Sequence, residues 1–210
     1  MGLKERTSEI IKRLKKEYPH PKTALDFKTP FELLVATILS AQTTDALVNK
    51  ITENLFKKYK SIKDYAAAPS DVFQKDLSSI NFYKTKAKNI QNTAKMIIER
   101  FNSSVPQTMD DLISLPGVAR KTANIILSNA YGINEGIAVD THVKRLAYRL
   151  GLTKNEDPVK VEMDIMSITP KNEWGNLSHL LISHGRKICQ AKKPKHDDCV
   201  LYNICPSKNI

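Results

Sequence analysis

Apolar side chains recur every three to four residues along most of the chain, which is the period of an amphipathic helix. In the segment 8–18, for example, Ile10, Ile11 and Leu14 share one face. The run 33–40 is apolar on every side, so we expect it to be buried. The pattern predicts helices over 8–18, 30–40, 45–59, 84–101, 109–114, 119–131, 141–150, 159–168 and 174–187.

Capping residues mark two of the helix starts. Thr29 precedes Pro30 and is followed three residues later by Glu32, which is a capping box with proline at the first helical position. Thr108 is placed to cap the short helix that follows it. Alternating strand patterns and hairpin turn dipeptides are essentially absent. The sequence therefore predicts an all-α protein, without a fixed-period repeat or a low-complexity linker.

The segment LPGVARKTA, residues 115–123, lies between two predicted helices. Pro116 ends the first helix, and Gly117 permits a backbone conformation that other residues avoid. The next helix begins within two residues, so its free N–H groups and its dipole can hold a DNA phosphate, as in a helix-hairpin-helix. An ordinary turn between helices is the alternative, because so short a motif also occurs without DNA binding. The expected DNA-binding residues of this loop are Gly117, Val118, Ala119 and Arg120.

Two side chains are suited to catalysis. Lys121 falls in the first turn of the second helix, where the positive end of the dipole and Arg120 disfavour the ammonium form, and a neutral amine is a nucleophile. A solvated lysine or a phosphate contact is the alternative. Asp140 precedes the predicted helix 141–150, where an N-cap would also be an oriented carboxylate that can accept a proton or stabilise a cation. We interpret the nearby His142 as structural.

The three cysteines, Cys189, Cys199 and Cys205, all lie near the C-terminal end of the sequence. An odd number confined to one segment, without a secretory signal, argues against a disulfide scaffold and indicates a metal or cluster site. His196 falls between them, so the order Cys-x6-His-x2-Cys-x5-Cys gathers four donors at ligand spacing. Packing of this segment without a metal is the alternative.

The net charge of the chain and the length of its apolar runs indicate which kinds of partner it can have. Lysine and arginine number 33 against 22 acidic residues, and the net charge of +11 suits a phosphate backbone as well as other anionic surfaces. No apolar run approaches the roughly 20 residues of a membrane span. The segment MGLKERTSEIIKRLKK lacks the apolar centre of a secretory signal, so a cytoplasmic protein is expected.

Taken together, these motifs resemble the endonuclease III family of DNA glycosylases. The similarity runs through PFELLVATILSAQTTD, LPGVARKTAN, AVDTH and SHGRKIC, and so covers almost the whole chain. The resemblance implies a bifunctional enzyme of base excision repair that removes oxidised pyrimidines. It implies that the amine of Lys121 attacks C1′ of the damaged nucleotide, that Asp140 assists, and that the resulting Schiff base leads to strand cleavage by β-elimination.

The same resemblance implies how the duplex is opened around an extruded nucleotide. The residue at the position of Gln42 inserts into the gap, and a bulky residue wedges the opposite strand. Phe82 is our candidate for the wedge, since an aromatic ring can stack on the unpaired base; a core anchor for the loop is the alternative. Asn81 stands where the family has a glycine, which alters the expected loop, although asparagine tolerates positive φ well.

A 4Fe–4S cluster is the implied cofactor, because the family has four cysteines at the spacing found here. His196 replaces the second of them. Our preferred hypothesis is that His196 is the fourth ligand, as histidine is in another cluster type. A cluster with a labile iron and a Cys3His zinc site are the alternatives.

The resemblance also implies the domain organisation and the partner. Residues 21–134 would form a six-helix lobe with the helix-hairpin-helix, and residues 1–20 plus 135–210 would form a lobe that carries the cluster. Double-stranded DNA with damaged bases or abasic sites is the expected partner of a monomer with no membrane contact, located in the cytoplasm and, in a prokaryote, at the nucleoid. Two other functions stay open: a mismatch or adenine glycosylase, against which Lys121 argues, and a non-catalytic DNA-binding module.

Overall fold

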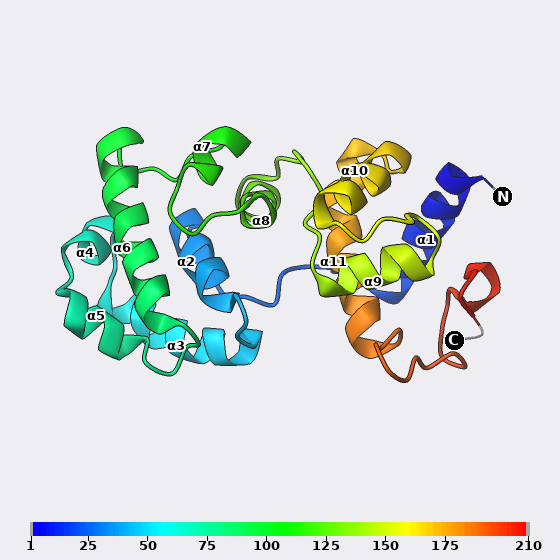
Figure 1. The fold of residues 1–210 in the computed structure, drawn as a ribbon, viewed down its shortest axis with the longest axis horizontal. Helices are drawn as coiled ribbons and strands as arrows, with labels where there is room; N and C mark the ends of the chain where they lie inside the picture. Colours follow the sequence, from blue (N-terminus) through cyan, green and yellow to red (C-terminus); the bar gives the residue numbers. More distant parts are fainter. Residues whose placement is uncertain (1, 209–210) are drawn as a thin grey trace. The chain divides into compact units, whose positions relative to one another are not determined.

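The computed structural model describes residues 2–208, and every regular element in that range is a helix (Figure 1). The all-α prediction is therefore confirmed. By its internal contacts the chain divides into two compact units, Thr23–Ile133 and Met1–Lys22 with Asn134–Ile210. The assignment of the helix-hairpin-helix to a lobe 21–134, and of the cluster to a lobe 1–20 plus 135–210, stays a prediction. None of the helices in the described range combines the length and apolar character needed to cross a bilayer.

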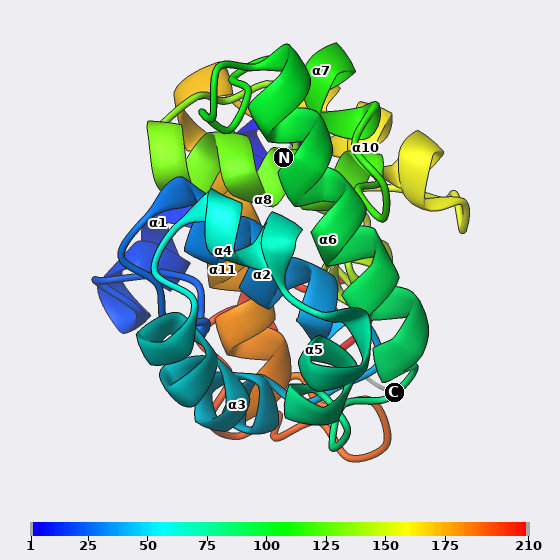
Figure 2. The same cartoon turned by 90° about the vertical axis from the view of Figure 1, so that its left-hand side faces the viewer.

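Seven α-helices surround one apolar core in the unit Thr23–Ile133. They are α2 (Pro30–Ser40), α3 (Asp45–Lys58), α4 (Ile62–Ala67), α5 (Ser70–Asp76), α6 (Tyr83–Arg100), α7 (Met109–Ile113) and α8 (Arg120–Tyr131). Helix α2 contacts α3, α6 and α8, while α4 and α5 pack along α6 (Figure 2). All residues of α2 from Leu33 to Leu39 are buried, as its uniformly apolar sequence predicts.

Local capping explains where two of these helices begin. The hydroxyl of Thr29 accepts the N–H of Glu32 at 3.2 Å, and the Glu32 carboxylate accepts the N–H of Thr29 at 3.3 Å. This is the predicted capping box. The hydroxyl of Thr108 accepts the N–H of Asp111 at 3.2 Å at the start of α7, which confirms the second predicted cap.

Three helical segments differ from the sequence prediction. Helices α4 and α5 are not predicted, because each is short and buries one aromatic side chain, Tyr65 and Phe73 respectively, which is too little for a period to be visible. With them the unit has seven helices, five of which the sequence pattern predicts. In the other unit, α1 (Leu3–Glu17) begins before the predicted start at Ser8, since its first turn is charged and largely exposed.

The second unit is built from both ends of the chain. Besides α1 it contains α9 (Thr141–Arg149), α10 (Pro158–Ile168), α11 (Trp174–Lys187) and the short 3-10 helices η1 (Lys171–Glu173) and η2 (Tyr202–Ile204). Helix α1 contacts α10 and α11, and α9 contacts the same two helices (Figure 1). Ile10 and Leu14 of α1 are fully buried in a core with Leu180 of α11. The N-terminal helix therefore completes a core that the C-terminal half cannot close by itself.

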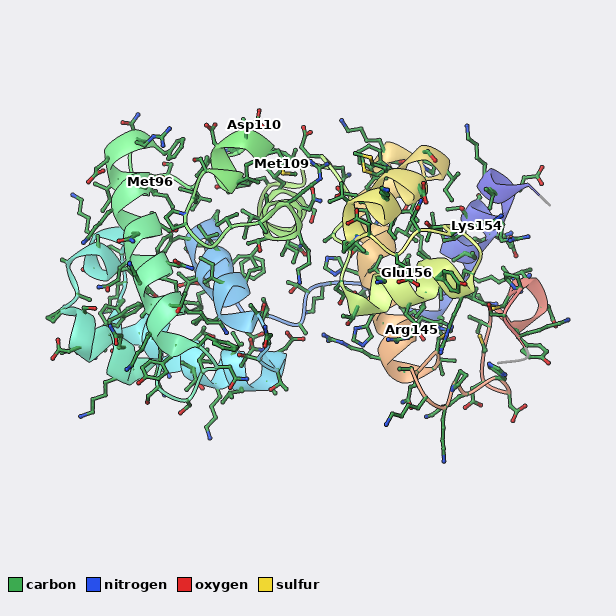
Figure 3. All side chains as sticks on the ribbon, viewed as in Figure 1. Met96, Met109, Asp110, Arg145, Lys154 and Glu156 are labelled. Carbon is green, nitrogen blue, oxygen red and sulfur yellow. The ribbon has the colours of Figure 1, made fainter. Side chains whose placement is uncertain are left out.

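Arg145 on α9, labelled in Figure 3, fixes the end of α11. Its guanidinium donates to the carbonyl oxygens of Gly185 and Cys189 at 3.0 and 3.1 Å. Carbonyl groups at the end of a helix have no partner within the helix, so an arginine from a neighbouring helix satisfies them. The contact determines where the segment that begins at Cys189 leaves the core.

Candidate functional site

The predicted hairpin connects α7 to α8 and is held from several sides. Gly117 has φ +80°, the left-handed conformation that its glycine was expected to supply. The side chains of Leu115 and Val118 are buried, and the N–H of Val118 donates to the carbonyl of Leu115 at 3.1 Å. The hydroxyl of Thr93 on α6 donates to the carbonyl of Pro116 at 2.9 Å. Val118 therefore shapes the loop from within, while the loop surface is formed by its neighbours.

Helix α8 begins with an exposed lysine beside uncapped backbone groups. Its N-cap residue, Ala119, provides no side-chain hydrogen bond, so no capping side chain uses the N–H groups of the first turn. Gly117, Arg120 and Lys121 are exposed, whereas Thr122 behind them is buried. An amine thus lies next to backbone donors at the positive end of α8, which is an arrangement that attracts phosphate.

Asp140 is the N-cap of α9, as predicted. Its Oδ1 accepts the N–H of Val143 at 2.8 Å, and its Oδ2 lies 3.5 Å from Nδ1 of His142. The carboxylate is 24% exposed. The cap therefore fixes the orientation of the group through one oxygen and leaves the other for His142 or for a substrate. Asp140 belongs to the unit Asn134–Ile210 with α1, whereas Lys121, Gln42 and the hairpin belong to Thr23–Ile133.

Gln42 and Phe82 both have a left-handed backbone, with φ of +53° and +57°. In residues 2–208 only four non-glycine residues have positive φ, and such strained conformations concentrate at functional sites. Phe82 is 64% exposed, so it does not anchor its loop in the core. Asn81 does not take the positive φ; its side-chain amide instead donates to the carbonyl of Gln42 at 2.7 Å. The two candidate insertion loops are therefore bonded to each other.

The four predicted donors in the C-terminal segment line one small cavity. They are Cys189, His196, Cys199 and Cys205. Burial raises the pKa of the Cys199 and Cys205 thiols, and a bound metal would replace their protons. Within the described part of the chain, no three His, Cys, Asp or Glu side chains come close enough together to hold a single metal ion. The structure therefore shows a shared cavity for the four donors.

Two basic side chains that the sequence did not indicate contact these sulfurs. Nη1 of Arg149 lies 3.3 Å from the sulfur of Cys189, and Nε2 of His184 lies 3.4 Å from the sulfur of Cys199. The hydroxyl of Tyr18 lies 3.2 Å from the other ring nitrogen of His184. Burial lowers the pKa of His184 to about 4, so the ring is neutral and has one N–H to donate. These partners are far apart in sequence, so no local motif reveals them.

Lys86 on α6 is another residue that is absent from the predicted site. It is only 6% exposed, and its ammonium contacts the segment that contains Gln42. The sequence feature that could have indicated Lys86 is its position on the apolar face of a helix, the face that also carries the fully buried Ile90 and Ile97. Such a position is compatible with a buried charge, but the sequence does not say which acceptors surround it.

Known proteins resemble this chain in both sequence and fold. The family model described as HhH-GPD superfamily base excision DNA repair protein matches residues 35–171. Endonuclease III of Synechocystis sp. is 49% identical over 97% of this chain and 93% of its own length. Endonuclease III of Bacillus subtilis is 48% identical over 90% of this chain and 86% of its own length.

Among solved structures, a trapped covalent intermediate of endonuclease III with DNA, in an estranged-adenine complex, matches with a TM-score of 0.93. It is 42% identical in sequence and the match covers 99% of this chain and 98% of that one. The family model spans more than half of the chain, and the relatives match over nearly its full length. The chain therefore belongs to the endonuclease III family, within the HhH-GPD superfamily of base excision DNA repair proteins.

Proposed function

We propose that Lys121 and Asp140 are the catalytic pair of this DNA glycosylase and abasic-site lyase. The observation that carries the proposal is the exposed amine of Lys121 in the first turn of α8, directly after a fixed hairpin. The endonuclease III that matches this chain at a TM-score of 0.93 was trapped as a covalent intermediate with DNA. A lysine amine is the group that forms a Schiff base with a sugar carbonyl carbon.

In the proposed reaction, the neutral amine of Lys121 attacks C1′ of the damaged nucleotide. The N-glycosidic bond breaks, and the base leaves with its bonding electrons and takes up a proton, while the amine nitrogen loses one proton. The C1′–O4′ bond then breaks, O4′ takes up a proton, and the opened sugar stays bonded to Lys121 as an iminium, the protonated Schiff base. The iminium then acidifies the C2′ proton. Removal of that proton expels the 3′ phosphate by β-elimination, which cleaves the strand, and water releases the enzyme from the sugar.

Asp140 is proposed to assist through the oxygen that its capping bond leaves available. That oxygen can accept a proton from the attacking amine or stabilise positive charge on the sugar as the glycosidic bond breaks. The hydrogen bond from Val143 keeps the carboxylate oriented before the substrate arrives, which reduces the reorganisation needed in the transition state.

Duplex DNA with an oxidised pyrimidine or an abasic site is the proposed substrate. The hairpin amides beside Gly117, Ala119 and Arg120 would hold a phosphate, and the net charge of +11 favours the approach of DNA. Gln42 would enter the space left by the extruded nucleotide and Phe82 would wedge the opposite strand, for which the 64% exposure of the Phe82 ring is suitable. We propose that the protein acts as a monomer in the cytoplasm, at the nucleoid in a prokaryote.

A 4Fe–4S cluster is the proposed cofactor, held by Cys189, His196, Cys199 and Cys205. All four side chains line one cavity. Each ligand of such a cluster binds a different iron, so cluster ligands lie further apart than the four donors of a single zinc ion. A Cys3His zinc site is the alternative, and iron and sulfide assays distinguish the two. When bound, the cluster would supply a rigid anchor for the surrounding loop.

Borohydride trapping tests the catalytic assignment. The protein and its Lys121→Ala variant would be incubated with duplexes that contain an oxidised pyrimidine, an abasic site, a G·T mismatch or adenine opposite 8-oxoguanine. We expect a covalent adduct and base release with the oxidised pyrimidine, an adduct with the abasic site, and neither adduct with Lys121→Ala. Lys63→Ala, which removes an exposed lysine from α4 in the same unit, is the control. An adduct of equal yield in Lys121→Ala would overturn the role of Lys121.

A further inference from the structure

Lys86 carries a buried ammonium group that has no carboxylate among its hydrogen-bond partners. Its Nζ donates to the carbonyl oxygens of Leu39 and Ala41 at 2.8 and 2.6 Å and to the hydroxyl of Thr43 at 3.2 Å. An ammonium has three donors, and these three acceptors use all of them. A fully bonded, 6% exposed lysine holds its acceptors in a fixed arrangement, because releasing any one leaves a buried charge with an unmet donor.

Two of the acceptors of Lys86, the carbonyl oxygens of Leu39 and Ala41, lie at the end of α2, and the third, the hydroxyl of Thr43, lies just beyond it. The last turn of α2 contains no basic residue, and Ala41, its C-cap, is not in the left-handed conformation that usually closes a helix. The final carbonyl oxygens also carry the negative end of the helix dipole. Lys86 therefore serves as a C-cap for α2 that comes from another helix, and it fixes the direction in which the chain continues toward Gln42.

The backbone of Lys86 contacts the second candidate insertion residue. Its N–H donates to the carbonyl of Phe82 at 3.1 Å in the first turn of α6. The side-chain amide of Asn81 donates to the carbonyl of Gln42 at 2.7 Å. Two strained residues, Gln42 and Phe82, are thus joined through Lys86 on one side and through Asn81 on the other.

We propose that Lys86 is a positioning residue that holds the Gln42 loop and the Phe82 turn as one preorganised insertion element. This inference rests on the proposed insertion of Gln42 and Phe82 into DNA. Strained φ values persist only where the surrounding structure determines them. With Lys86 in place, both residues meet the duplex in their inserted conformation; without it, the loop must be ordered during extrusion of the damaged nucleotide.

Single-turnover base release from an oxidised-pyrimidine duplex, compared with trapping on a duplex with a preformed abasic site, tests the proposal. Lys86→Met keeps the length and apolar contacts of the side chain and removes its donors. We expect base release to fall by about ten- to hundredfold, the usual effect of a small misplacement. Trapping should retain a much larger share of its rate, because no base has to be extruded. Lys88→Met, an exposed lysine on the same helix, is the matched control.

A double-mutant cycle with Gln42→Ala separates positioning from a general loss of structure. If Lys86 acts through the Gln42 loop, Lys86→Met should slow base release much less in the Gln42→Ala background than in the parent. Equal slowing in both backgrounds would overturn the proposal. Asn81→Ala changes an exposed side chain, so it folds even where Lys86→Met does not, and we expect a smaller effect in the same direction. No change in base release with Asn81→Ala or with folded Lys86→Met would also overturn it.

The insertion hypothesis can fail independently of the Lys86 proposal. If Gln42→Ala and Phe82→Ala both release the base at the parent rate, the insertion role itself is wrong. If they slow base release while Lys86→Met and Asn81→Ala do not, insertion stands and the positioning role of Lys86 is wrong. Fluorescence of 2-aminopurine next to the lesion distinguishes slower extrusion from slower chemistry, since it reports unstacking before the bond breaks.

Discussion

Two glycines at opposite ends of α8 allow the hairpin to be tested against a matched control. Gly117 lies in the hairpin with φ +80°, and Gly132 is the C-cap of the same helix with φ +67°. An alanine at either position adopts a left-handed backbone, at a cost of about 1–2 kcal/mol, partly offset by the lower entropy of the unfolded chain. This net backbone cost is common to both substitutions, so it cancels when the stabilities of the two variants are compared.

The surroundings of the two glycines differ. A Cβ at Gly132 would meet no atom within 4 Å, whereas a Cβ at Gly117 would lie 3.1 Å from Cβ and 3.2 Å from Cγ of Asn89 on α6. The Cβ of Asn89 is fixed to the helix backbone, so rotation of that side chain cannot relieve the contact. The hairpin and α6 must separate by a few tenths of an ångström, and such overpacking costs about 1–3 kcal/mol. We expect destabilisation of about 1 kcal/mol for Gly132→Ala and about 2–4 kcal/mol for Gly117→Ala.

Urea unfolding measures the stabilities, and binding to an undamaged duplex at fixed salt measures the function of the hairpin. Displacement of one amide–phosphate hydrogen bond should weaken binding by Gly117→Ala about ten- to hundredfold, since bonds to charged groups contribute about 1.5–3 kcal/mol. Gly132→Ala should bind as the parent does. Asn89→Ala should restore little of the stability of Gly117→Ala, because it retains the Cβ that makes the closest fixed contact. Equal destabilisation by the two glycine substitutions would refute the steric reasoning.

Substitutions at three further positions test individual side chains. Asp140→Asn should preserve the cap of α9, so its free energy of unfolding should stay within about 0.5 kcal/mol of the parent, whereas Asp140→Ala should lose about 1 kcal/mol in thermal unfolding. Base release should fall in both variants. Full activity of Asp140→Asn would exclude a role for the charge. His196→Cys should retain iron and sulfide while His196→Ala loses iron, and unchanged iron in His196→Ala would exclude His196 as a ligand. Phe82→Ala should change stability by less than about 0.5 kcal/mol, since the ring is exposed, and should slow base release; a large loss of stability would indicate a core role.

Features that depend on neighbouring residues in the sequence could be predicted well. The capping box at Thr29 and the cap at Thr108 each involve groups three residues apart, and both are present. The left-handed glycine at Gly117 follows from the short connection between two helices. The cap at Asp140 belongs to the same class, because it requires only a helix that starts directly after it.

Features that depend on tertiary structure could not be predicted in this way. Hydrophobicity alone leaves Phe82 equally suited to a core and to a wedge, and only its 64% exposure excludes the core. The positive φ expected near Asn81 falls on Phe82, because the side chain of Asn81 is bonded to the Gln42 loop. His184 reaches the sulfur of Cys199 only through the packing of α11 and the C-terminal segment. The acceptors of Lys86 are likewise supplied by a different helix.

The strained backbone conformations of Gln42 and Phe82 favour a preorganised insertion element over a flexible one. Left-handed conformations at Gln42 and Phe82 are unfavourable for non-glycine residues, so mobile loops would relax out of them. Both are retained beside a buried lysine whose three donors are all bonded and beside a direct bond between the loops. Glycine at either position would relieve the strain and would also remove the side chain that is proposed to contact the duplex. Strain at both positions is what the proposed insertion role predicts, because a strained conformation persists where the surrounding structure holds it for binding.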